Sequence, residues 1–207
     1  MTAADINGVT IEYEVHGPET GEPVLLVMGL GAQLVVWPQD FIDVLVDAGH
    51  RVIAFDNRDI GRSGRIDAPA PELGTLLRAL TSRRPIPAPY SLADMADDAA
   101  GLLRHLEVPR AHVVGVSMGG MISQELAIRH PDLVATLTSI MSNTGSHRNR
   151  RPSSALLPAL VKARSNATGG IEDAIALGRL IAGPHFDEES ARQVEELEIS
   201  RAGDPTT

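Results

Sequence analysis

The sequence predicts an α/β fold in which a mostly parallel sheet is flanked by helices, and three observations support this prediction. A continuous apolar run at 24–28 has the pattern of a parallel strand that is covered on both faces, and residues 51–56 are predicted to form the next buried strand. Helical patterns alternate with such runs along the chain, as they do in parallel sheets. A glycine-flanked serine at 115–119 stands between a third apolar run and a helical pattern, which indicates a sharp strand-to-helix turn.

The first ninety residues supply the early elements of this fold. They comprise an alternating strand at 9–15, a buried strand at 24–28, an amphipathic helix at 41–49 and a second buried strand at 51–56. Gly49 closes the helix, because glycine readily adopts the backbone conformation that follows helix ends. Residues 65–90 carry several prolines and no clear period, so we expect an irregular segment with one helical turn near 73–80.

Later residues continue the alternation and then change in character at about residue 145. Ser91 and Asp94 form a capping-box pattern at the start of a helix that runs through Glu107. The next predicted elements are a strand at 111–116, a helix at 118–130 and a strand at 133–141. A basic loop at 147–152 follows, and then three helical segments at 153–165, 170–182 and 187–201 with no buried strand pattern between them.

The composition is that of an ordinary globular protein and argues against several classes of partner. Hydrophobic residues make up 43% of the chain and charged residues 22%. The net charge of −9 argues against nucleic acid or an anionic membrane as a general partner, because both require basic surfaces. The chain has no cysteine, which excludes disulfides and thiolate chemistry. No secretion signal or bilayer-spanning run is recognisable, so the expected location is the cytoplasm.

The G-x-S-x-G stretch at 115–119 points to Ser117 as a nucleophile. Gly115 and Gly119 remove side chains that would clash across the turn, and the turn lifts the hydroxyl clear of the sheet. The first N–H groups of the following helix then point to the place where an oxyanion forms, and the helix dipole favours negative charge there. Gly120 allows the helix to pack close to the sheet. The alternative is a glycine-rich turn that holds an inert serine.

Three ordered motifs resemble those of the α/β-hydrolase superfamily: MGLG at 28–31, DNRDIGRSG at 56–64 and VVGVSMGG at 113–120. They are most similar to the motifs of single-domain esterases near the anthracycline methylesterases. The resemblance runs from about residue 6 to about residue 145 and is weaker beyond. It implies an α/β-hydrolase fold, with residues 1–145 as the N-terminal part of the core and residues 146–207 as an incomplete helical cap.

The resemblance also implies a mechanism. It makes Ser117 the nucleophile of carboxylic-ester hydrolysis through an acyl-enzyme, and it makes the backbone N–H groups of Leu30 and Met118 the oxyanion hole. Many relatives have histidine at the position of Met28, but the oxyanion hole uses backbone groups, so this departure should leave it intact. No metal or organic cofactor is implied.

The loop DNRDIGRSG is expected to be mainly structural. The resemblance implies that Arg58 pairs with a carboxylate, that Gly61 fits a tight turn and that Ser63 acts as a cap. Relatives commonly have glycine at the position of Asp59, which leaves the local backbone geometry open. Asp56 is not expected to be catalytic, because in this fold the acid follows the serine in the chain.

The partners of a triad serine are missing from their usual settings. The histidines are His16, His50, His105, His112, His130, His147 and His185. His112 is expected at the far end of the strand that leads to Ser117, and His130 at the end of the following helix. Relatives carry the acid after a later strand and the histidine in a G-M-G-H pattern, and neither occurs here. Asp132, Asp173, Asp187 and Asp204 lack the right setting.

We therefore expect this chain to be the N-terminal part of a longer hydrolase that lacks the C-terminal strands and ends inside or just after the cap. Movement of His147 or His185 from the cap remains an alternative source of the base. The strand at 133–141 would then be an open apolar edge and an aggregation risk. Oligomeric state stays open.

Several functions remain compatible with the sequence. The first is a serine hydrolase acting on a small apolar ester-like substrate, with the cap shaping an apolar pocket near Trp37 and Met118. For Trp37, packing in the core is favoured over substrate contact. The second is an inactive fragment or a non-catalytic ligand-binding or interaction module on the same fold. Cofactor-free haloperoxidase or C–C hydrolase chemistry is a third. A basic cluster, Arg148, Arg150 and Arg151, is interpreted as a solvated loop.

Overall fold

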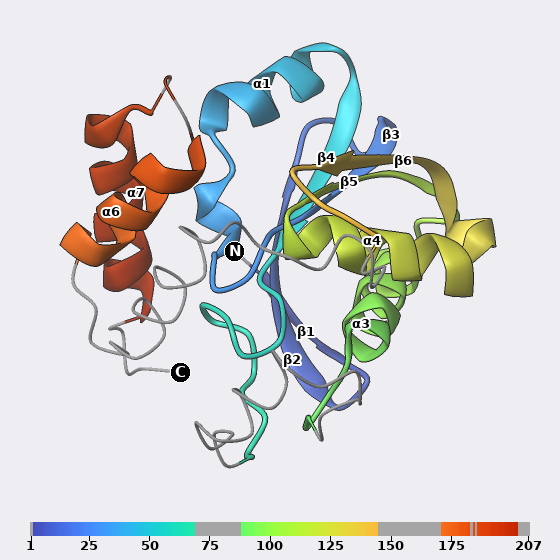
Figure 1. Ribbon diagram of the computed structural model, residues 1–207. Coiled ribbons are helices and arrows are strands. Elements are labelled where there is room, and N and C mark those ends of the chain that lie inside the picture. Colours follow the sequence, from blue (N-terminus) through green and yellow to red (C-terminus); the bar gives the residue numbers. More distant parts are fainter. Residues whose placement is uncertain (1, 69–87, 145–170, 183, 185, 203–207) are drawn as a thin grey trace.

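The computed structural model describes residues 2–68, 88–144, 171–182, 184 and 186–202, and these residues contain one six-stranded sheet (Figure 1). Its strands are β1 (Thr2–Ile6), β2 (Val9–His16), β3 (Glu22–Val27), β4 (His50–Phe55), β5 (Ala111–Val116) and β6 (Val134–Ile140). They lie in the order β1-β2-β4-β3-β5-β6. The pairs β1–β2 and β2–β4 are antiparallel, whereas β4, β3, β5 and β6 run parallel. The predicted α/β fold with a mostly parallel sheet is therefore confirmed.

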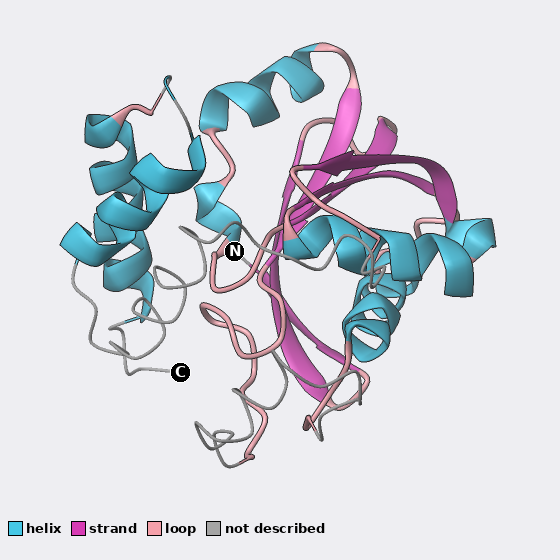
Figure 2. Ribbon diagram, in the orientation of Figure 1, coloured by secondary structure: helices cyan, strands magenta, loops and turns pink. Residues whose placement is uncertain are grey.

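The helices of the described residues lie close to the predicted positions (Figure 2). They are η1 (Leu34–Val36), α1 (Gln39–Asp47), α3 (Leu92–His105), α4 (Met118–Arg129), η2 (Pro131–Leu133), α6 (Ile171–Ala182) and α7 (Glu188–Ala202). Helix α1 begins two residues earlier than predicted because Pro38 serves as its N-cap and Phe41 N–H already donates to the Pro38 carbonyl. The carbonyl of the N-cap residue thus accepts the first bond of the helix.

Strand β1 was not predicted from the sequence. This strand forms a hairpin with β2 in which Ile6 lies opposite Val9, and Asn7 and Gly8 make the two-residue turn. Both turn residues have positive φ, 54° for Asn7 and 77° for Gly8, which is the geometry of a type I′ turn. The Asn-Gly dipeptide was the signal that could have revealed the strand, because this pair is favoured in such turns.

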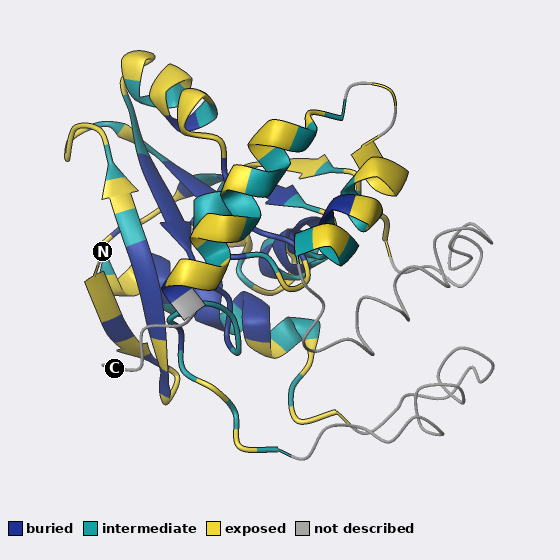
Figure 3. Cartoon of the chain, turned by 90° about the vertical axis from the view of Figure 1, so that its left-hand side faces the viewer, coloured by how far each residue is buried: buried dark blue, intermediate teal, exposed yellow. Residues whose placement is uncertain are grey.

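Side chains of the parallel strands alternate between two core layers, one on each face of the sheet. Leu25 and Val27 of β3 belong to the layer under α3 and α4, whereas Val24 and Leu26 face Ile42 of α1. Figure 1 shows α3 and α4 on one side of the sheet and α1 on the other, and the carboxyl-terminal parts of β3 and β4 between them are buried, as are the dark blue strand segments in Figure 3. Burying each such side chain contributes about 1.5–3 kcal/mol. The fully apolar runs of the sequence therefore reflect strands covered on both faces.

Helix α3 begins with the predicted capping box. The Ser91 hydroxyl accepts a hydrogen bond from the Asp94 N–H at 3.3 Å, and the Asp94 carboxylate accepts one from the Ser91 N–H at 2.7 Å. The Ser91 hydroxyl also donates to the Asp94 carboxylate at 2.7 Å, and this bond, together with the one from the Ser91 N–H, lowers the pKa of Asp94 because both stabilise the charged form. The reciprocal bonds satisfy two N–H groups that the helix itself cannot pair. They fix where α3 starts, beside the loop that follows β4.

Strand β6 is an edge strand in the described part of the chain, as expected. It pairs with β5 alone, and the residues at its centre are exposed. Leu137 on this strand is 38% exposed and Met141 just beyond it is 70% exposed. An apolar strand with an open hydrogen-bonding edge is a ready template for pairing with another chain.

Some expectations fall outside the described residues. These are the helical turn near 73–80, the basic loop at 147–152 with its three arginines, and the helix at 153–165. In the described segments, no helix has both the length and the apolar character that crossing a bilayer requires.

Candidate functional site

Ser117 occupies a sharp turn between β5 and α4. Its backbone has φ 55° and ψ −119°, a combination that favours glycine, and its N–H donates to the Ile140 carbonyl at 2.8 Å. The residue is exposed although its neighbours Gly115 and Gly119 are buried. The turn therefore holds the hydroxyl out of the core at the N-terminus of α4, as the G-x-S-x-G stretch predicts.

The glycines around Ser117 are required by close packing of the backbone. A Cβ on Gly115 would collide with the Gly119 carbonyl and the Ser123 hydroxyl. A Cβ on Gly119 would lie 2.6 Å from the Met28 carbonyl oxygen, and one on Gly120 would lie 2.6 Å from the Cβ of Ser142. The first turn of α4 thus packs directly against the end of β3 and the segment after β6.

The loop after β3 lies directly against Ser117. A Cβ built on Gly29 would lie 3.3 Å from the Ser117 Cβ and 3.8 Å from its Oγ. The two segments meet because β3 and β5 are parallel neighbours, with Val27 opposite Gly115, so their carboxyl ends share one edge of the sheet. The next residue, Leu30, is 70% exposed. The structure thereby brings the MGLG loop and the serine turn together.

Arg58 in the loop after β4 makes the predicted carboxylate pair. Its Nε and terminal nitrogen donate to the two carboxylate oxygens of Asp98 in α3, at 2.6 and 2.7 Å, and both side chains are buried. The hydrogen bond to Asp98 raises the pKa of Arg58. The guanidinium also lies 5.2 Å from the centre of the Tyr90 ring. Burial, reinforced by Asp59, raises the pKa of Tyr90 to about 12, so the phenol is neutral.

The expectation that Ser63 acts as a cap is wrong. Its hydroxyl donates to the Asp56 carbonyl at 2.6 Å and accepts from the Glu12 N–H at 3.0 Å, so it joins the loop to β2 instead of ending a helix. Gly61 does occupy a tight turn, with φ 57° and no room for a Cβ beside the Asp56 carboxylate. Asp59 has φ 68°, which explains why glycine suits this position.

Asp56 is buried and structural, consistent with the expectation that it is not catalytic. Its carboxylate accepts from the N–H of Leu34 at 2.6 Å and from the N–H of Arg62 at 3.1 Å. It also receives a hydrogen bond from Arg201 of α7 at 3.1 Å. These bonds tie together the loops that follow β3 and β4, one of which carries Leu30.

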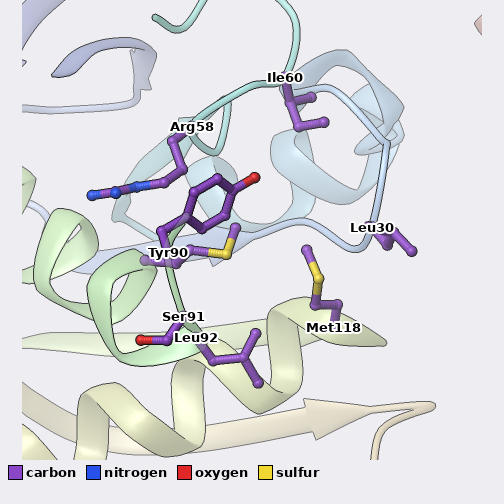
Figure 4. A pocket seen from close by; sticks show the side chains of 8 residues that line it. Leu30, Arg58, Ile60, Tyr90, Ser91, Leu92 and Met118 are labelled. Carbon is purple, nitrogen blue, oxygen red and sulfur yellow. The ribbon is translucent and has the colours of Figure 1, made fainter. Parts of the chain in front are cut away.

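A pocket of about 350 Å³ opens beside the serine turn. Its lining residues are Leu30, Arg58, Ile60, Tyr90, Ser91, Leu92, Met95 and Met118 (Figure 4). Figure 4 shows Leu30 and Met118, the residues on the two loops that meet at Ser117, at one side of this group. Most of the lining side chains are apolar, and the guanidinium of Arg58, which also lines the pocket, is paired with Asp98. Trp37 lies elsewhere: it is 6% exposed, stacks on Phe41 and belongs to the core under α1, as the favoured interpretation had it.

The described histidines lie away from Ser117. His112 is the second residue of β5 and contacts Glu22 at 2.9 Å and Thr136 at 2.7 Å, at the opposite end of the sheet. The hydrogen bond from His112 lowers the pKa of Glu22. His130 ends α4, where its Nε2 lies 2.7 Å from Asp97. Asp97 also pairs with Arg129, which lowers the pKa of the carboxyl group. Twelve helical residues, about 18 Å, separate His130 from Ser117.

His16, His50 and His105 occupy strand and helix ends distant from the serine turn. His147 and His185 fall outside the described residues. The described part of the chain therefore assembles the serine and its neighbouring loops without a base beside them.

Comparisons with known proteins identify the fold family of this chain. A family model described as the alpha/beta hydrolase fold matches residues 22–178. Rhodomycin D methylesterase DnrP of Streptomyces peucetius is 38% identical over 133 residues, which are 64% of this chain and 39% of that protein. A protein named as a carbamate hydrolase, RutD of Variovorax paradoxus, is 40% identical over 130 residues, 63% of this chain and 41% of the relative. The chain thus matches about two fifths of the length of these curated relatives.

Solved structures share the same fold. The esterase RhEst1 of Rhodococcus sp. ECU1013 superimposes with a TM-score of 0.72 at 23% identity, covering 97% of this chain and 66% of that one. The hydrolase BphD of Rhodococcus sp. strain RHA1 superimposes with a TM-score of 0.71 at 19% identity, covering 98% and 66%. Together with the family match over most of its length, these findings show that the chain belongs to the α/β-hydrolase fold family.

Proposed function

We propose that this chain supplies the nucleophile and the oxyanion-binding groups of a carboxylic-ester hydrolase. One observation carries the proposal: an exposed serine on a glycine-favoured turn lies against the Gly29–Leu30 loop, at the side of an apolar pocket. Ser117 is the nucleophile, and the backbone N–H groups of Leu30 and Met118 stabilise the oxyanion. The relative named as a methylesterase supports an ester as the substrate.

The reaction proceeds in two steps. The Ser117 Oγ bonds to the ester carbonyl carbon, and the C–O bond to the alcohol breaks once the tetrahedral oxyanion has formed. The proton of the hydroxyl passes to a general base and from it to the leaving alkoxide. Water then hydrolyses the acyl-enzyme and restores the hydroxyl. Loss of one oxyanion donor from such a site typically lowers kcat by about 10²–10³.

The helix that follows the serine contributes to the same charge stabilisation. The first N–H groups of any α-helix lack intrahelical acceptors and carry partial positive charge. Met118 and Gly119 begin α4, so their N–H groups lie beside the Ser117 hydroxyl. The chain therefore concentrates donors where negative charge develops.

The pocket indicates the kind of substrate. A volume of about 350 Å³ suits a small organic group, and its walls come from Ile60, Leu92, Met95 and other apolar side chains. Its cation, Arg58, is already neutralised by Asp98. The proposed substrate is therefore a small ester with an uncharged, apolar group on the side that enters this pocket.

The base of the reaction lies outside the described residues. No described side chain forms a hydrogen bond with the Ser117 hydroxyl, and the described histidines lie elsewhere. We assign the base to His147 or His185, the two histidines of this chain that lie outside the described residues. Without a base, loss of rate on the order of 10⁶ is typical of serine hydrolases.

A fluorophosphonate probe tests the proposal, because its phosphorus bonds to an activated serine Oγ as fluoride leaves. We expect the wild-type chain to be labelled and Ser117→Ala to be unlabelled. Ser139→Ala is the matched control, since Ser139 is an exposed serine on β6, and it should be labelled like the wild type. A wild-type chain that melts cooperatively but takes up no probe would overturn the proposal and favour a non-catalytic binding module.

A further inference from the structure

A buried glutamine joins the oxyanion loop to the distant helix α7. Gln33 is 6% exposed and immediately precedes η1. Its backbone N–H donates to the Glu198 carboxylate at 2.6 Å, and its side-chain amide donates to the Glu198 carbonyl at 2.8 Å. Its amide oxygen accepts from Arg201 at 2.6 Å. Figure 1 shows α7 beside the segment that carries η1.

The loop from Met28 to Gln33 is fixed at both of its ends. At the first end, the Asn57 side chain donates to the Met28 carbonyl at 3.0 Å. At the second end, Gln33 is bound to α7 and the Leu34 N–H donates to the Asp56 carboxylate at 2.6 Å. Between these anchors the backbone includes two glycines and passes within contact distance of Ser117 at Gly29. The anchors, rather than packing of the exposed Leu30 side chain, hold this backbone in place.

We propose that Gln33 is a positioning residue that sets the backbone N–H of Leu30 against Ser117, and that α7 enforces this position through Glu198 and Arg201. The inference rests on the proposed function of Ser117, and it adds α7 as a functional part of the site. Gln33 lies three residues from Leu30, so a shift of this anchor moves the N–H that the oxyanion needs.

The bonds among Gln33, Glu198, Arg201 and Asp56 are buried, which allows them to hold the Leu30 backbone in a fixed position. Arg201 is 4% exposed and Asp56 is fully buried, so their ion pair is shielded from solvent. Replacing the Gln33 side-chain amide by an apolar group removes the donor to the Glu198 carbonyl and one of the acceptors of Arg201, and such losses are costly for buried polar groups. Catalysis by a preorganised donor depends on placement, and an error of 1 Å can cost about 10²-fold in rate.

The charge state of Glu198 modulates this contact. Burial raises its pKa to about 7, reinforced by the nearby carboxylates of Glu195 and Asp56 and opposed by the Gln33 N–H and by Arg201. Burial also raises the pKa of Glu195. The helix therefore presents a carboxyl group that changes charge close to neutral pH at the point where it binds the loop.

Labelling kinetics with the fluorophosphonate probe test the positioning role. We expect Gln33→Leu to lower the limiting labelling rate about 10- to 100-fold, with a smaller change in probe affinity because the pocket walls are retained. Gln39→Leu is the matched control: Gln39 is exposed and bonds only locally, to Asp43. Glu198→Ala should reproduce the loss, and Glu198→Gln should restore most of the rate, since an amide oxygen can still accept from Gln33. Equal labelling rates for Gln33→Leu and Gln39→Leu would overturn the inference. A labelling rate for Glu198→Gln as low as that for Glu198→Ala would also overturn it.

Amide hydrogen exchange provides a readout that does not depend on a reactive serine. In Gln33→Leu the amides of residues 30–34 should exchange faster than in the wild type, while those of β3 and β5 stay protected. A wild-type chain that takes up no probe would defeat the proposed function alone, and the exchange data would still judge the anchor. Unchanged exchange at residues 30–34 would refute the positioning role by itself.

Discussion

Replacing Ser117 with glycine is expected to stabilise the chain while removing its nucleophile. The backbone at Ser117, with φ 55° and ψ −119°, lies in a region that side chains with a Cβ rarely adopt. The side chain is exposed and contributes little packing that the substitution would lose. Alanine at the same position also removes the hydroxyl but keeps the Cβ, so it should retain the strain.

The magnitude follows from two opposing contributions. A strained backbone of this kind costs about 1–3 kcal/mol. Glycine relieves this strain, but it also lowers the stability of the folded state by about 0.4–1 kcal/mol because it increases the conformational entropy of the unfolded chain. The free energy of unfolding of Ser117→Gly should therefore be about 0.5–2 kcal/mol higher than that of Ser117→Ala. This difference corresponds to a Tm that is about 1–8 °C higher for a domain of this size.

Thermal and urea unfolding of the two variants, followed by circular dichroism, provide the comparison. Both variants should fail to react with the fluorophosphonate probe, so any difference in stability between them reports the backbone. A glycine variant that is no more stable than the alanine variant would refute the reasoning that the turn is strained.

Three further outcomes are expected. Asp98→Ala should lower the free energy of unfolding by about 3–5 kcal/mol, because it leaves the buried Arg58 without its carboxylate partner. Asp97→Ala removes one side of a partly exposed ion pair and should lower the free energy of unfolding by only about 0–1 kcal/mol. Similar urea midpoints for the two variants would contradict this difference. The pKa of Glu198 is raised to about 7 in the folded chain, so its contribution to stability is fully present below about pH 4.5 and is lost as the pH rises through 7. The Tm of the wild type should therefore fall relative to that of Glu198→Gln between pH 5 and pH 8. Parallel Tm–pH profiles for the two proteins would contradict this contribution of Glu198. Leu137→Lys should reduce self-association in light scattering with little change in stability, and undiminished scattering would show that the β6 edge is not the contact.

Local patterns were enough to predict most of the elements and the serine turn. The apolar runs gave the buried strands because a strand covered on both faces needs apolar side chains at every position. The capping box at Ser91 and the glycines around Ser117 were readable because backbone geometry at such points admits few residue types. The hairpin turn at Asn7 carries the same kind of local signal, because an Asn-Gly pair favours the positive φ angles that this turn requires.

Contacts between distant residues were decided only by the tertiary structure. The sequence indicated that Arg58 has a carboxylate partner, but packing of α3 selected Asp98, 40 residues away. Nothing in the sequence near Gln33 indicated that α7, 165 residues further on, would hold it. Ser63 likewise bonds across to β2 instead of capping a helix. Backbone conformation and side-chain periodicity are properties of short segments, whereas the meeting of two loops depends on strand order and helix packing over the whole chain. The sequence by itself therefore determined the turn that exposes Ser117, and the folded chain alone determined what surrounds it.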